Sequence, residues 1–190
     1  MRHLWLELIL ESDVILSRDA STQGGHQSLD HIPGSCFLGV CAGALYGRSG
    51  LDALAVFHHG AVRFGNAYPL TDGGHRTVPI PLAWHGYKGL AWPEGSGSEG
   101  PAKIPGEILN FSSGTSTQRD TWRARGAQPV QLRGGYVSCS GETPAVLRRY
   151  HVKTAMNRDQ GGRAREAHLF GYEGLAEGTR WAFRIDLDDA

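Results

Sequence analysis

The sequence predicts an α+β domain of the ferredoxin-like kind, with an antiparallel sheet and loop insertions. Three observations favour this class. The chain of 190 residues opens and closes on segments with the apolar alternation of β-strands, residues 3–11 and 179–187. A single short helical segment follows the first strand, and several further strand segments precede the last one. Because segments with the strand period dominate, a helical bundle is excluded.

The first half of the chain begins with the strand at residues 3–11, whose alternate positions form one apolar face: Leu4, Leu6, Leu8 and Leu10. A polar loop is expected over residues 12–30. The small apolar residues of CFLGVCAGALYG then predict a helix over residues 36–47, with Ser35 as its N-cap. Residues 54–64 predict a hairpin that turns at His59-Gly60.

The second half contains weaker signals. Residues 76–84 predict a strand that Pro79 and Pro81 confine to a sheet edge or an extended segment. Glycine, proline and serine are frequent in residues 92–106, and we expect a flexible insertion over residues 92–125 of an otherwise single domain, residues 1–190. Further strands are expected over residues 128–140, with a break at Gly134-Gly135, and over residues 149–156, 169–175 and 179–187.

Several function classes are excluded by composition. No apolar run approaches the roughly 18 residues that cross a membrane, and the apolar N-terminus is too short for a signal peptide, so we expect a cytoplasmic protein. The three cysteines include no Cys-x-x-Cys pair, which argues against a disulfide framework and a zinc site. The nine histidines show no metal-ligand spacing, and we expect no cofactor.

Positive charge is concentrated in one segment of a chain whose formal net charge is zero. Residues 119–165 contain ten basic and three acidic side chains, a local charge of +7. Arginine outnumbers lysine sixteen to three, and the guanidinium group suits bidentate contacts with phosphate. A neutral chain with one basic segment indicates a localised site for a polyanion such as RNA.

Four short motifs could form this site. Ile32 to Ser35 opens a helix, where free backbone N–H groups suit a phosphate, although an ordinary capped turn explains it equally well. Residues 63–69 follow a strand and place aromatic rings beside glycine and asparagine, which favours either stacking on a base or packing in the core. Residues 132–136 combine two glycines with an arginine and a tyrosine.

The fourth motif is the basic run from Tyr150 to Arg165. On a strand, one face of this run contains His151, Lys153 and Asn157, which suits phosphates and 2′-hydroxyl groups; the alternative is a solvated strand edge. A loop around Gly161-Gly162 is expected to follow. His151 and Lys153 could also support metal-independent cleavage of a precursor RNA, which His151→Ala would abolish.

The order of these motifs resembles that of the CRISPR-associated RAMP superfamily. The segment LDHIPGSCFLGVCAGAL resembles its first motif, in which Ile-Pro-Gly-Ser opens the first helix of an RRM-type, ferredoxin-like domain. The segments VRFGNAYPL, RGGYVS and YHVKTAMNRDQGGRAREAHLFGYEGLAEGTRWAFRI are similar to later motifs of the type III branch. Within that branch the sequence most resembles the type III-D effector subunit that caps the 5′ end of the guide RNA. Only residues 92–125 have no counterpart.

The resemblance implies a non-catalytic RAMP domain that binds guide RNA (crRNA) inside an effector ribonucleoprotein in antiviral defense. Its partners would be the guide RNA, the other CRISPR effector subunits and, through the complex, the target nucleic acid. The RNA-binding positions that it implies are Gly34, Ser35, Phe64, Gly65, Asn66, Tyr68, Arg133, Gly134, Gly135, Tyr136, His151, Lys153, Arg158, Arg163 and Arg165.

Two departures and one alternative accompany this resemblance. The expected helix has no charged residue, and Leu38 stands where family members carry a basic one. Family members also continue beyond a point equivalent to Ala190, which implies a truncated or split subunit. The alternative is a backbone subunit that cuts target RNA with Mg²⁺ and an aspartate after the first strand, where Asp30 and Asp19 are the candidates and Asp13 is a weaker one.

Overall fold

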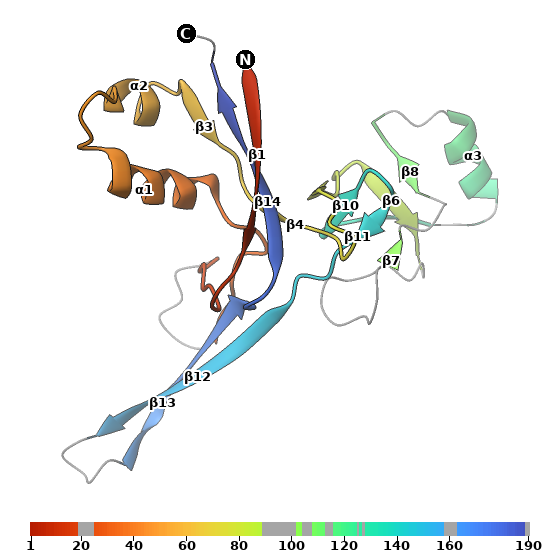
Figure 1. Cartoon of the computed structure of the whole chain (residues 1–190). Coiled ribbons are helices and arrows are strands. Elements are labelled where there is room, and N and C mark those ends of the chain that lie inside the picture. Colours follow the sequence, from red (N-terminus) through yellow and green to blue (C-terminus); the bar gives the residue numbers. More distant parts are fainter. Residues whose placement is uncertain are drawn as a thin grey trace. The chain divides into compact units, whose positions relative to one another are not determined.

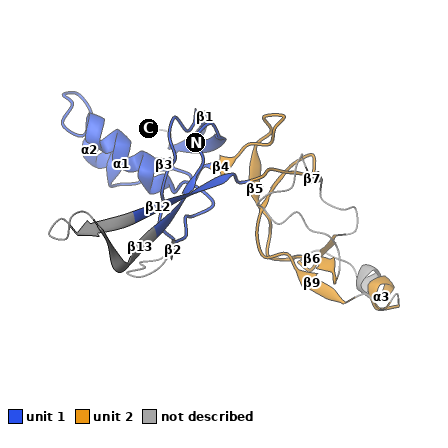
Figure 2. Ribbon diagram, turned by 90° about the horizontal axis from the view of Figure 1, so that it is seen from below, with its two compact units in different colours: residues 1–67, 146–190 blue, residues 68–145 orange. Residues whose placement is uncertain are grey.

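The structure of the chain, a computed structural model, describes residues 1–18, 25–88, 102–103, 108–112, 116–124, 126, 128–157 and 163–188. It is a mixed α+β fold in which most strands pair antiparallel (Figure 1). The predicted α+β class is therefore confirmed. The chain, expected as a single domain, packs as two compact units, residues 1–67 with 146–190 and residues 68–145 (Figure 2).

The first unit is built on the two terminal strands. β1 (Arg2–Ile9) pairs antiparallel with β14 (Arg180–Leu187) through eight consecutive partners, and β14 pairs on its other side with β3 (Val62–Phe64). Leu6 lies opposite Phe183 and Leu8 opposite Trp181, so the apolar alternations of the two segments share one face of the sheet. Trp181 is completely buried and Phe183 is 9% exposed, so the core of this sheet lies around these two side chains, whereas Leu4 and Leu6 on the same face are 50% and 42% exposed.

Helix α1 (Gly34–Leu45) covers part of that face. Its Phe37 ring stacks on Phe183 of β14, with the ring centroids 4.0 Å apart. The predicted helix is confirmed, but its N-cap is Pro33 and not Ser35, which lies inside the first turn with its side chain exposed. No helix among the described residues is long and apolar enough to cross a membrane.

The hairpin expected over residues 54–64 is wrong in its first half, which is helical, and right only in that its second half contains a strand. Residues Ala53–Phe57 form a short helix, α2, whose N-cap Asp52 accepts a hydrogen bond from the Ala55 amide at 3.0 Å. This side-chain cap satisfies a backbone donor at the helix start and so favours helix over strand in a segment without clear periodicity. The second half of the hairpin is β3, which pairs with the C-terminal strand instead.

A second sheet of the first unit contains the longest strands of the described chain. β12 (Arg148–Asn157) and β13 (Arg163–Leu175) form an antiparallel pair, here called the ribbon, with a register shift between Thr154 and Met156. The short strand β2 (Gly25–His26), in a segment expected as loop, adds parallel to β13. The order is β12-β13-β2, so β12 is an outer strand of this sheet.

The second unit is made of short strands around a small core of Ile80, Leu132 and Val137. Its elements are β4 (Tyr68–Pro69), β5 (Thr77–Pro79), β6 (Trp84–Tyr87), β7 (Ala102–Lys103), β8 (Leu109–Asn110), α3 (Ser116–Ala124), β9 (Pro129–Gln131), β10 (Tyr136–Ser138) and β11 (Glu142–Thr143). The predicted break at Gly134-Gly135 is confirmed, since it separates β9 from β10. Helix α3 was not predicted, and much of the expected insertion, residues 92–125, lies outside the described residues.

Candidate nucleic-acid interface

The two faces of the ribbon carry different side chains. Residues directly opposite each other in an antiparallel pair share a face, and successive residues alternate. One face, here the lysine face, therefore contains Arg149, His151 and Lys153 of β12 with Tyr172 and Gly174 of β13. The other, here the tyrosine face, contains Arg148, Tyr150 and Val152 with Gly171 and Glu173.

His151 on the lysine face is held by the loop that follows β1. Its Nε2 atom lies 2.7 Å from Oδ2 of Asp13, and the Arg149 guanidinium lies 3.3 Å from Oδ1 of the same carboxylate. The backbone N–H of Glu177 donates to Oδ1 at 2.8 Å. That backbone hydrogen bond is the main reason the pKa of Asp13 lies below its usual value, with further lowering by His151 and Arg149. Asp13 therefore joins three segments at the base of the ribbon.

Lys153 lies beyond His151 on the same face. Its ammonium group is 5.7 Å from the ring centroid of Tyr172, a cation–π distance. The Tyr172 ring stacks in turn on His26 of β2, with centroids 4.9 Å apart and an interplanar angle of 3°. Among the described residues Lys153 makes no ion pair.

The Ile32–Ser35 turn and the segment after β3 meet in the structure, although 32 residues separate them. The Gly34 amide donates to Oδ1 of Asn66 at 2.9 Å, and Ile32 and Ala67 exchange two backbone hydrogen bonds. A methyl group on Gly34 would overlap the carbonyl oxygen of Phe64, and one on Gly65 would approach the carbonyl oxygen of Arg184 to 2.9 Å. The two glycines thus allow close backbone packing. The backbone N–H of Gly34, which we expected to bind a phosphate, donates its hydrogen bond to Asn66 instead.

The motif from Arg133 to Tyr136 belongs to the second unit. Tyr136 is 3% exposed and packs against Tyr68 with ring centroids 5.4 Å apart, so the Tyr136 ring serves packing rather than stacking on a base. Gly135 has a φ of 91° and accepts a hydrogen bond from the Ile80 amide through its carbonyl oxygen. Arg133 and Gly134 are exposed.

Several predicted residues fall partly or wholly outside the described residues. Arg158 and Asp19 lie there entirely. Arg163 and Arg165 belong to β13 and not to the expected loop, and their side chains are not among those described. Asp30 is described, and its carboxylate lies 3.1 Å from Nδ1 of His31. The described residues contain no group of three or more side chains able to hold a metal ion.

Sequence reasoning missed Tyr172 and His26, included Tyr150 only as the first residue of a basic run, and gave Asp13 too little weight. Tyr172 and Tyr150 lie in strands that were predicted, but nothing in the sequence shows which residues they contact. His26 lies in a segment expected as loop. Asp13 was a weak candidate for metal binding, whereas the structure makes it the hydrogen-bond partner of His151.

Comparison with known proteins adds no family to this geometry. No family model matches the chain, and no curated protein matches it.

Proposed function

We propose that this chain is a guide-RNA-binding structural subunit of a type III CRISPR effector ribonucleoprotein, with a RAMP-type, ferredoxin-like fold. In this role it holds the RNA backbone near its 5′ end, and catalysis is left to other subunits. The motif order of the sequence supports the family, and the arrangement of β1, α1 and β3 is compatible with the fold.

The observation that carries the RNA-binding proposal is the lysine face of the ribbon. Lys153 and His151 lie on one face beside Tyr172, and Lys153 has no carboxylate partner among the described residues. The ammonium group of Lys153 presents donors to phosphate and 2′-hydroxyl oxygens, while the imidazole of His151 is held by Asp13 beside it. Arg158, Arg163 and Arg165 follow Lys153 in the sequence and add positive charge to this segment of the chain.

The arginines at the base of the ribbon are already in ion pairs, and we assign them to holding the ribbon in place. Arg148 pairs with Glu173 at 2.7 Å, and Arg149 contacts both Asp13 and Glu177. These paired guanidinium groups attract phosphate less strongly than a free cation does, because their charge is already compensated. We therefore assign the phosphate contact to Lys153 and the residues beyond it.

The test measures binding of the full chain to a single-stranded RNA at several salt concentrations. Each phosphate contact with a single strand contributes about 0.7 to the slope of log affinity against log salt. Lys153→Ala should weaken binding and reduce the slope by about that amount. Arg48→Ala removes an exposed cation that follows α1 and should leave both unchanged. Absence of RNA binding by the wild-type chain, or an unchanged slope for Lys153→Ala, contradicts the proposal.

A further inference from the structure

The tyrosine face of the ribbon carries an exposed ring with a fixed position. Tyr150 is 61% exposed on the outer strand β12. Its hydroxyl end lies over Gly171 of β13, where a methyl group built on the glycine would overlap it. The ring tip thus occupies the space that a side chain would fill, and the ring reaches across the neighbouring strand. An exposed ring held in this way presents a flat apolar surface to solvent.

The surroundings of Tyr150 extend this surface. Val152, the next residue on the same face, is 56% exposed, and Arg148 lies on the other side of Tyr150. Arg148 is fixed by its ion pair with Glu173, whose Oε1 atom also lies 3.4 Å from the Ser28 amide nitrogen. The ring therefore stands between an aliphatic side chain and a fixed guanidinium group.

The lysine face lies around the edge of the same strand. In the described sheet β12 pairs only with β13, so its outer edge is open. Tyr150 and Lys153 are three residues apart, about 10 Å along a strand. A polynucleotide that follows this edge can place a phosphate at Lys153 and a neighbouring base on Tyr150.

We propose that Tyr150 is a stacking platform for one unpaired base of a single-stranded RNA that lies along the edge of β12. This inference rests on the proposed RNA-binding function and names its substrate class. A base within a duplex is already stacked on both sides, whereas an unpaired base gains a new partner in the ring. A flat ring tolerates any base, so the platform contributes affinity without sequence specificity.

The experiment uses the full chain and compares a single-stranded RNA with a blunt duplex of the same sequence, again at several salt concentrations. Tyr150→Leu should weaken single-strand binding roughly five- to 150-fold, the range expected for loss of one base–aromatic stack. The salt slope should stay at the wild-type value, because the ring carries no charge. Tyr150→Phe keeps the ring and should bind like the wild type.

Two further variants separate stacking from other effects. Trp5→Leu removes an aromatic side chain of similar exposure, 52%, from β1 and should leave binding unchanged. Gly171→Ala leaves Tyr150 in the chain but displaces its ring, and it should weaken binding while the thermal unfolding of the variant shows that it is folded.

The failures of the two proposals are distinguishable. If the wild-type chain binds RNA with a salt-dependent affinity and Tyr150→Leu binds equally well, Tyr150 is not a stacking platform. The RNA-binding function is then unaffected. Equal affinity for the duplex also overturns the platform. Absence of binding by the wild-type chain at low salt overturns both.

Discussion

The first unit contains two long antiparallel strand pairs that differ in register and in packing, although both expose apolar side chains: Leu4, Trp5, Leu6 and Ile9 on β1, and Tyr150 and Val152 on β12. The β1–β14 pair has eight partners in unbroken register, and α1 packs on its apolar face through Phe37. The β12–β13 ribbon contains a register shift and exposes Tyr150 and Val152 on one face.

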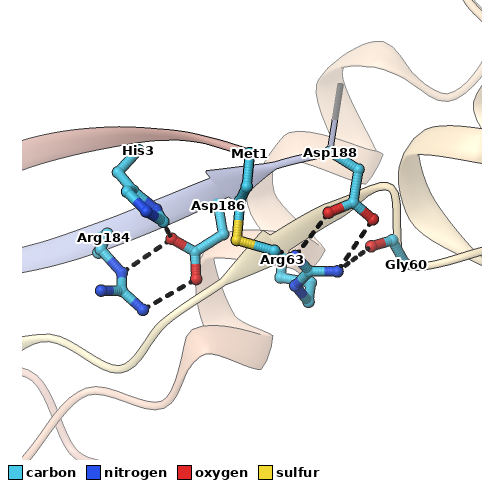
Figure 3. A network of polar contacts seen from close by, with 7 residues as sticks. All are labelled: Met1, His3, Gly60, Arg63, Arg184, Asp186 and Asp188. Carbon is cyan, nitrogen blue, oxygen red and sulfur yellow. Dashed lines mark hydrogen bonds and ion pairs between the residues drawn. The ribbon is translucent and has the colours of Figure 1, made fainter. Parts of the chain in front are cut away.

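The ion pairs on the two strand pairs also differ in where they lie. On the polar face of the β1–β14 pair, His3 and Arg184 converge on Asp186, and Arg63 of β3 pairs with Asp188 (Figure 3). On the ribbon, ion pairs occur at the base, while Lys153 has none among the described residues. The ion pairs on the first strand pair therefore link its strands to each other and to β3, whereas on the ribbon the described ion pairs lie at its base, and the proposed function assigns the ribbon to a ligand.

The largest change in the free energy of unfolding is expected for a core residue of β14, and a residue on the ribbon surface is its control. Trp181→Ala removes a completely buried side chain and should lower the free energy of unfolding by about 3–5 kcal/mol. Val152→Ala, at an exposed position, should change it by less than about 0.5 kcal/mol. Chemical denaturation of both variants measures the two values. Similar losses for both would remove the distinction between the two strand pairs.

A smaller effect tests the close packing of α1 on the segment after β3. Gly34→Ala forces a methyl group against the Phe64 carbonyl and should cost about 1–3 kcal/mol. Gly39→Ala lies in the same helix with open space around it, and should stabilise the protein by about 0.5–1 kcal/mol. Thermal unfolding should therefore shift in opposite directions for the two variants. Shifts of the same sign would contradict the close approach.

The smallest effect concerns acid sensitivity at the base of the ribbon. The pKa of Asp13 is lowered, first by the Glu177 N–H and then by His151 and Arg149. The folded state therefore favours the ionised form of this side chain over the protonated form. The stability it contributes is complete above its ordinary value of 3.8 and is lost as the pH falls through the lowered pKa. Unfolding measured between about pH 6 and pH 2 should therefore decline less steeply for Asp13→Asn than for the wild type. Parallel curves would show that the Asp13 contacts contribute nothing to folding.

The sequence predicted the elements with strong periodicity and missed those that depend on single contacts. The alternation of Trp181, Phe183, Ile185 and Leu187 identified β14, and the small apolar run identified α1. Residues 53–57 were mistaken for a strand, because the effect of the Asp52 cap was not recognised. Helix α3 was missed because its residues are mostly polar, although its Trp122 is buried.

The candidate site was predictable only along individual strands. Alternation placed His151 and Lys153 on one face, and the structure agrees. Contacts between distant residues had no signal in a single sequence. Asp13 and His151 are 138 residues apart, and neither residue type indicates the other. For the same reason Tyr136 was taken as a stacking ring although it is buried.

Photochemical crosslinking of the full chain to a single-stranded RNA containing 4-thiouridine locates the RNA on the protein. Mass spectrometry of the digested complex then identifies the crosslinked residues. We expect crosslinks within residues 146–176, at or next to Tyr150 and Lys153, and their loss when an unlabelled RNA competes. Crosslinks confined to residues 68–145, or to the β1–β14 pair, would contradict the assignment of the RNA to the ribbon.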